Sequence, residues 1–481
     1  MQLSNDSEVS EVKRIIDPET KRFREFLFFF SGQNVSFLGS SIVSFAIIWW
    51  LTVTTQSELM LGIASLVSLG PYIFAAPVSG VLADRLNRKM LLIVLDAAQA
   101  LLTVTLSILF LTNNISIAII LVILGLRGTA QAFHQPVDMA IVPTMVPQKH
   151  LSRINGASYL FGGLINIIGP VVGASLLAIP GVNIGMILWI DVITFGIALI
   201  PLLIVKIPSV ARKTLEVKEE KKSFFAEFAE GFTALKSTKG MIALLFGAMT
   251  INFFLSPLMA LLPLFVNKVH GGNEVNYATV IGMLQAAIVV GGLIMSFFKG
   301  FKKPVLFLLF SVTFQAVCQI ALTFIPTDFS GRFWTIGGIL FCFALPFAII
   351  DVTFITSIQL MIPREKLGRV IATIMAISPA IRPLGQFLSG IIAEFVGINL
   401  VLIVSAILTV VSLLTIYLLT PMRKLDSEIN RILTEAKESK NIDSLGMEHS
   451  DEEIDIVLNE KVESDFQMAI FDQEVSAVEV K

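Results

Sequence analysis

Long apolar stretches separated by short polar connections dominate this chain. Twelve of these stretches are long enough to cross the ~30 Å hydrocarbon core of a bilayer as helices. The predicted spans are residues 26–54, 59–83, 90–111, 115–137, 154–180, 184–205, 240–267, 277–298, 304–325, 333–360, 370–396 and 399–420. The pattern therefore predicts an all-α integral membrane protein.

Composition agrees with a membrane protein, and the absence of catalytic motifs argues against an enzyme. Of 481 residues, 55% are hydrophobic and only 15% are charged, whereas soluble domains carry about 25% charged residues. Both cysteines, Cys318 and Cys342, lie within apolar stretches, so no disulfide framework is indicated. The sequence contains no nucleotide-binding loop, metal-ligand spacing or nucleophile elbow. We therefore expect no enzyme activity, no cofactor, no bound metal and no nucleic-acid partner.

The distribution of positive charge predicts the orientation in the membrane. The amino-terminal lead and the even-numbered connections contain 24 lysines and arginines, whereas the odd-numbered connections contain only Lys268 and Arg332. Positively charged connections stay on the cytoplasmic side. Both termini are therefore predicted to be cytoplasmic.

An internal repeat divides the spans six and six. Residues 147–153 (Pro-Gln-Lys-His-Leu-Ser-Arg) match residues 363–369 (Pro-Arg-Glu-Lys-Leu-Gly-Arg), and the same offset places Gly169 on Gly385. Two repeated six-helix halves are typical of transporters that bind their substrate between the halves. The predicted organisation is a cytoplasmic lead (1–25), an amino-terminal bundle (26–205), a cytoplasmic loop (206–239), a carboxy-terminal bundle (240–420) and an acidic cytoplasmic tail (421–481).

The tail has twelve acids and two lysines from residue 441 onward. This composition favours a disordered, solvated segment. A regulatory or partner-binding role is the alternative.

A charged connection between the second and third spans is the most specific motif. It reads Gly80-Val-Leu-Ala-Asp84-Arg85-Leu-Asn87-Arg88-Lys89. Three cations and one carboxylate in a tight hairpin can hold neighbouring helix ends together in one state and release them in another. Its spacing resembles the loop signature between helices 2 and 3 of the major facilitator superfamily. We predict a gating loop that uses Gly80, Asp84, Arg85, Arg88 and Lys89; a simple topology anchor is the alternative.

Ionisable residues within the spans are candidates for a substrate and proton pathway, because burying them in a membrane is costly. Three of them, Arg127, His134 and Asp138, follow one helical face of the fourth span together with Gln131, and Asp351 could neutralise Arg382 in the second half. Asp96 and Asp191 are weaker candidates for proton binding. A structural hydrogen-bonded stripe is the alternative interpretation. The predicted pathway comprises Gln33, Asn34, Arg127, Gln131, His134, Asp138, Asp351 and Arg382.

Several segments resemble the macrolide efflux branch of this superfamily. They are Gly32-Gln33, Arg127-Gly-Thr-Ala-Gln-Ala-Phe133-His134-Gln-Pro136, Val146-Pro147 with Leu151, and Leu367-Gly368-Arg369-Val370. The resemblance runs from about residue 25 to about residue 422 and leaves out the acidic tail. It implies a monomeric transporter of the bacterial cytoplasmic membrane that exports bulky amphipathic, macrolide-like compounds in exchange for protons.

Two other functions stay open. Relatives of this branch include siderophore exporters and lysophospholipid transporters, and fold alone does not select the substrate. A membrane sensor that signals through its acidic tail is an alternative of another class.

If the loop is a gate, Asp84→Asn should strongly reduce transport while leaving expression and substrate binding largely intact. We expect its carboxylate to interact near residues 367–369 when the cytoplasmic side is shut, because helix amino termini favour anions. The measurement is efflux at matched membrane levels of the protein. Normal efflux by the variant would reduce the loop to a topology anchor.

Overall fold

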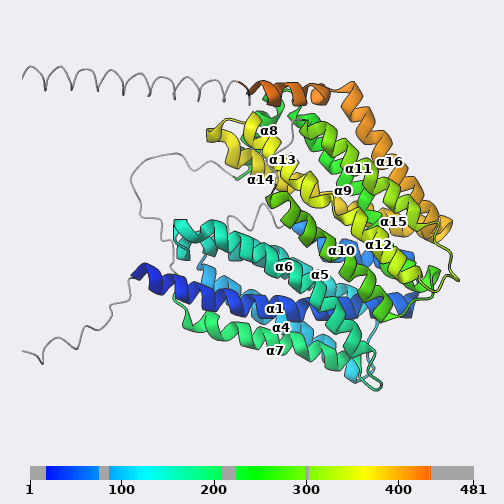
Figure 1. Cartoon of the computed structure of the whole chain (residues 1–481). Coiled ribbons are helices and arrows are strands. Elements are labelled where there is room, and N and C mark those ends of the chain that lie inside the picture. The colour runs from blue at the N-terminus through cyan, green and yellow to red at the C-terminus, as the bar shows by residue number, and fades with distance from the viewer. Residues whose placement is uncertain (1–17, 75–85, 208–223, 298–302, 433, 435–481) are drawn as a thin grey trace, which may run out of the picture. The chain divides into compact units, whose positions relative to one another are not determined.

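The computed structural model describes residues 18–74, 86–207, 224–297, 303–432 and 434, and these residues fold into helices (Figure 1). The chain divides into two units, Met1–Arg423 and Lys424–Lys481. The helices of the first unit are α1 (Pro18–Thr55), α2 (Glu58–Leu69), α4 (Arg88–Leu111), α5 (Ile117–Met145), α6 (Gln148–Leu177), α7 (Ile184–Ile204), α8 (Phe224–Ser237), α9 (Met241–Leu264), the π-helix η1 (Phe265–Val269), α10 (Glu274–Ser296), α11 (Pro304–Leu322), α12 (Arg332–Ala344), α13 (Phe347–Met361), α14 (Arg364–Ala380), α15 (Arg382–Val396) and α16 (Ile398–Leu419).

Eleven helical stretches among the described residues are long and apolar enough to cross a membrane. A shorter apolar helical stretch, Glu58–Phe74, occupies the start of the span predicted for residues 59–83; residues 75–85 lie outside the described part of the chain. The all-α membrane architecture is thus confirmed. We call the helix ends that the charge distribution assigns to the outside the outer ends.

Helical structure extends into segments that the sequence assigned to connections. α1 begins at Pro18, inside the predicted lead, and α8 lies in the predicted loop 206–239. Beyond α16, a 3-10 turn covers Pro421–Lys424 and residues 425–432 are helical.

Of the predicted spans that the structure describes over their full length, three are not continuous α-helices. The tenth is divided into α12 and α13 at residues 345–346, and the eleventh into α14 and α15 at Ile381. Pro346 lies at the first break, and Pro379 and Pro383 flank the second; proline lacks the backbone donor that a helix needs at such positions. The seventh ends in η1, whose wider turn changes the direction of its side chains.

The internal repeat is visible in local geometry. Pro147 and Pro363 precede α6 and α14 with nearly the same backbone angles, φ −58° and ψ 143° against φ −56° and ψ 143°. Gly169 of α6 lies directly against Ser41 of α1. Gly385 of α15 lies in the same way against Ser256 of α9. Each half therefore brings an equivalent pair of helices together at an equivalent glycine.

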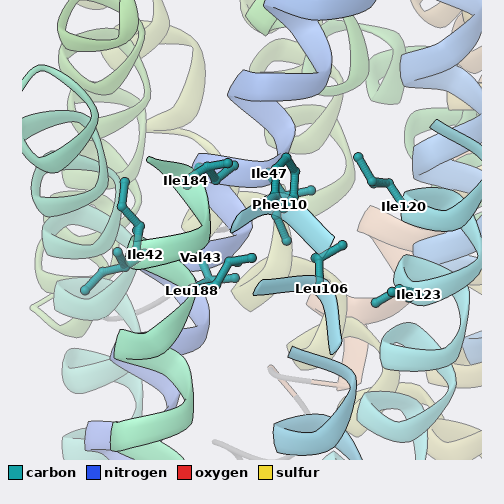
Figure 2. Close-up of a cluster of buried hydrophobic side chains, with 11 residues drawn as sticks. Ile42, Val43, Ile47, Leu106, Phe110, Ile120, Ile123, Ile184 and Leu188 are labelled. Atoms are coloured by element: carbon teal, nitrogen blue, oxygen red, sulfur yellow. The ribbon is translucent and has the colours of Figure 1, made fainter. Parts of the chain in front are cut away.

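Two apolar layers form the core of the amino-terminal half. The outer layer joins α1, α4, α5 and α7 through buried side chains that include Ile47, Leu106, Ile123 and Leu188 (Figure 2). A second layer nearer the opposite ends of the same helices includes Phe29, Leu92, Val137 and Leu202. Along α4, α5 and α7, charged side chains occupy the positions between these layers.

Candidate functional site

Arg127 of α5 is bound within the amino-terminal half. Its Nη1 atom lies 2.7 Å from the Asp191 carboxylate of α7, and it also contacts the Thr103 hydroxyl of α4. Ser40 of α1 and Thr103 donate to the two Asp191 oxygens at 2.8 and 2.9 Å. Asp191 is fully buried. A single carboxylate thus connects four helices, and both of its oxygens are satisfied.

His134 forms a second buried pair two turns along α5. Its Nε2 atom lies 2.9 Å from Oδ1 of Asp96 on α4, and both side chains are at most 3% exposed. The ring also meets Phe37 of α1 edge to face, with the ring centroids 5.9 Å apart. Asp138, one turn further along α5, interacts electrostatically with both His134 and Asp96.

The other predicted pathway residues of this half have no such charged partners among the described residues. Gln131 is half-buried, and Gln33 is buried with neither polar side-chain atom hydrogen-bonded. The Asn34 amide donates to Phe30 O within its own helix at 2.7 Å. The fourth-span stripe therefore separates into an Arg127 network and a His134 cluster.

Arg382 lies at the break between α14 and α15. Its guanidinium donates to Oδ1 of Asn252 on α9 at 2.7 Å, and the Asn252 amide donates to Ser378 at 3.1 Å. Asp351 of α13 interacts electrostatically with Arg382 but forms no direct ion pair with it. The expected neutralisation by Asp351 thus acts at longer range, while Asn252 is the direct partner.

Asp351 also faces the other half of the protein. It is exposed, and it is close enough to Tyr159 of α6 to interact electrostatically. Arg382 is exposed as well. These two opposite charges therefore lie at the boundary between the halves with part of their surface accessible.

The predicted gating loop is only partly described. Gly80, Asp84 and Arg85 lie outside the described residues. Arg88 donates to Ala140 O of α5 at 2.8 Å. Lys89 donates to Leu203 O and Val205 O at 2.7 and 2.8 Å, at the carboxyl end of α7, where a cation is favoured. The two described cations thus bind the start of α4 to neighbouring helix ends.

The segment expected to meet Asp84 has a partner in the loop that joins the two halves. Arg369 of α14 donates to Glu230 of α8 at 2.7 Å. Both side chains are partly exposed. α8 is thereby attached to the start of the eleventh span.

Polar contacts join the two halves at their outer ends, and we call this set the outer gate. Lys268 of η1 binds the Glu58 carboxylate of α2 at 2.9 and 3.1 Å, and the Gln56 amide donates to Asn267 of η1 at 2.6 Å. Glu394 of α15 accepts from the Ser57 hydroxyl at 3.1 Å and from the Leu59 backbone amide at 3.2 Å. Glu58 is only 4% exposed.

Close helix packing continues the outer gate toward the membrane centre. A Cβ atom on Gly62 of α2 would lie 3.1 Å from Phe387 O and 3.2 Å from the Gly390 Cα of α15. Phe45 and Trp49 of α1 stack on Tyr277 of α10 with ring centroids 5.2 and 5.6 Å apart. Every hydrogen bond that joins described residues across the two halves belongs to the outer gate, which is therefore closed in this structure.

Sequence reasoning underrated several of these residues. Asp96 and Asp191 seemed minor because each is isolated on its own span, although they lie at depths that match His134 and Arg127. Glu58 and Lys268 were not selected at all. The sequence did contain a signal for Lys268, because it is one of only two lysines and arginines in the odd-numbered connections.

Residues 29–385 match the family model described as Major Facilitator Superfamily. The chain belongs to this superfamily. Solved structures agree on the fold: that of a mutant form of the nucleoside transporter NupG superposes with a TM-score of 0.65 at 13% identity, covering 81% of this chain and 98% of that one.

Two curated relatives are informative about the branch. Macrolide efflux protein A of Streptococcus pyogenes is 29% identical over 407 residues, which cover 84% of this chain and 97% of the relative. The Staphyloferrin A transporter of Staphylococcus aureus is 28% identical over 156 residues, 32% of this chain and 38% of the relative. The resemblance to the macrolide efflux branch is thus confirmed. The family and these relatives are transporters.

Removing Arg127 should destabilise the protein strongly, because Asp191 would remain buried without its cation. For Arg127→Ala we expect a loss of about 3–5 kcal/mol, measured as a lower thermal unfolding midpoint in detergent. The double variant Arg127→Met/Asp191→Leu should recover most of this loss, because it removes both charges. Equal destabilisation by the single and double variants would show that the ion pair is not the cause.

Lys268→Gln should weaken the outer gate and increase the outward-open population. Because Lys268 is partly exposed, we expect an effect of about 1 kcal/mol, or roughly fivefold in the population ratio. Distances between spin labels at Thr54 and Val275, in a variant lacking Cys318 and Cys342, measure this ratio. Lys236→Gln, which removes an exposed lysine in the last turn of α8, is the matched control. An unchanged distance distribution in Lys268→Gln would exclude a gating role for this ion pair.

Proposed function

We propose that this protein exports bulky amphipathic compounds of the macrolide type in exchange for protons. It would do so as a monomer in the bacterial cytoplasmic membrane, with both termini in the cytoplasm. The observation that carries the proposal is the similarity to Macrolide efflux protein A along 97% of that relative's length. A match of this extent includes both halves, and the pathway of such a transporter lies between the halves.

The closed outer gate supports alternating access. Hydrogen bonds between described residues of the two halves are confined to the outer ends, where Lys268, Glu58 and Glu394 meet. Such a conformation would accept substrate from the cytoplasmic side. Breaking the outer gate and closing the opposite side would then expose the substrate to the outside, and this sequence of states fits export.

Exposed charges at the boundary between the halves support an amphipathic substrate. Asp351 and Arg382 are exposed, whereas Arg127 and Asp191 are buried and bound to each other. The polar part of a substrate would therefore meet the charges of the carboxy-terminal half. The Asp351 carboxylate is suited to an amine, a common basic group of macrolides.

One observation favours a siderophore as the second candidate. The Arg382 guanidinium has an exposed surface and only a neutral direct partner, Asn252, so it can bind a carboxylate. The Staphyloferrin A transporter is similar to one third of this chain. The two candidates differ in the charge that the substrate presents to Asp351 and Arg382.

Expression in a macrolide-susceptible, efflux-deficient bacterium tests the proposal. Cells with the wild-type protein should accumulate several-fold less radiolabelled erythromycin than cells with an empty vector, and a protonophore should abolish the difference. Asp351→Asn should reduce export of this cationic drug while Arg382→Gln should affect it less. Erythromycin accumulation should be measured for the gating-loop variant Asp84→Asn in the same cells.

The outcomes separate the alternatives. Unchanged accumulation across a broad drug panel would overturn macrolide export. Siderophore export that depends on Arg382 would then support the second candidate, and altered lysophospholipid uptake would support lipid handling. A protein that moves none of these compounds but binds a partner through its acidic tail would support the sensor.

A further inference from the structure

We infer that His134, paired with Asp96, is the group that binds the exchanged proton, and that Asp138 connects it to the cytoplasmic side. This inference deepens the proposed proton exchange and rests on it. It assigns the two buried ion pairs of the amino-terminal half to different tasks. The Arg127–Asp191 pair holds helices together, and the His134 cluster carries the proton.

The charge balance of the His134 cluster favours one additional proton. Asp96 and Asp138 are the two carboxylates that act electrostatically on His134. With a neutral imidazole the cluster has two negative charges and no cation. Arg127 cannot balance them, because it already binds Asp191. Protonation of His134 halves the net charge of the cluster in a region of low dielectric constant, where like charges repel strongly.

The hydrogen-bond geometry leaves a place for that proton. His134 Nε2 faces Asp96 Oδ1 at 2.9 Å, whereas His134 Nδ1 is buried and has no hydrogen-bond partner among the described residues. In the neutral state a hydrogen on Nε2 points to the carboxylate and the lone pair of Nδ1 is available. The proton adds to Nδ1 and forms an imidazolium beside Asp96. Release reverses this step and breaks only the N–H bond.

Among the described residues, the cations on the helices packed around His134 lie near the helix ends. On α4, Arg88 and Lys89 lie in the first turn, two turns before Asp96, and donate to Ala140 O of α5 and to Leu203 O and Val205 O. α1 places the Phe37 ring against the imidazole. The described part of α2 contributes Glu58, at its outer end, and Tyr72 follows this helix. On α6 the cationic and histidine side chains, Lys149, His150 and Arg153, all lie in the first two turns.

Asp138 lies on the route between this cluster and the cytoplasmic ends of the helices. It follows His134 by one turn on the same face of α5 and is half-buried, whereas His134 is 2% exposed. Its neighbour Met139 is 62% exposed. A proton can therefore reach His134 through a partly exposed carboxylate rather than through the apolar layer that contains Val137 and Leu202.

Two measurements test the inference, and the first needs no substrate. The chain has four histidines, so nitrogen NMR of ¹⁵N-histidine-labelled protein in nanodiscs can assign His134 from the signals missing in His134→Gln. Between about pH 5 and 9, the range in which histidine titrates, both ring nitrogens should become protonated in one step. Asp96→Asn should move that step to lower pH. Ring signals that do not change over the whole range would overturn the inference.

The second measurement separates coupling from transport. In proteoliposomes, His134→Gln should exchange erythromycin across the membrane at near wild-type rates. The accumulation of erythromycin that a pH gradient drives should fall at least about tenfold in this variant. His150→Gln, at the cytoplasmic start of α6, is the matched control and should retain both activities. His134→Asn replaces the glutamine variant if the latter does not reach the membrane.

Failure of the proton-site assignment can be distinguished from failure of the proposed substrate. Full gradient-driven accumulation by His134→Gln would overturn the assignment of the proton site while leaving proton-driven export intact. A wild-type protein that moves no erythromycin would overturn the proposed substrate, and the NMR titration would still decide on His134.

Discussion

The burial of charge in a membrane is the constraint on which the amino-terminal half depends. An ionised side chain between two apolar layers is stable only when an opposite charge and hydrogen bonds satisfy it. Arg127 meets this condition because α1, α4 and α7 each supply an oxygen atom to its network with Asp191. The requirement fixes the rotation of four helices at once. It also explains why the charged side chains Asp96, Arg127, His134 and Asp191 are all buried at this depth.

The carboxy-terminal half accommodates its membrane-embedded charges in a different way. Its charges lie at helix breaks, where Arg382 has a neutral amide as its direct partner and Asp351 is at longer range. Accessible charges of this kind cost less, since they keep contact with water, but they hold the helices less firmly. The two halves therefore share a repeat and a fold but satisfy their charges in different ways.

Much of the fold could be predicted from the sequence, because a bilayer requires apolar stretches of defined length. The repeat was readable because residues 147–153 match residues 363–369, and the family was readable from the motif between Gly80 and Lys89. The pairing of charges was less accessible: the face occupied by Arg127 and His134 was visible in their spacing, but the partners Asp191 and Asp96 lie on other helices. The outer gate was missed because Glu58 precedes a span and Lys268 lies in a π-helix, and neither position carries a periodic signal. The breaks at Pro346 and Ile381 were also missed, since hydropathy continues across them.

The glycine contact between α2 and α15 has a consequence for how the transporter moves. Gly62 and Gly390 bring two backbones within van der Waals distance, and the attraction between such surfaces decreases steeply when they separate by even 1 Å. A slightly parted interface would lose this attraction without gaining room for water or a lipid chain. Intermediate separations are thus less stable than either the joined or the fully parted arrangement. The outer side should therefore open cooperatively, in one step, which prevents a leak of protons through a half-open protein.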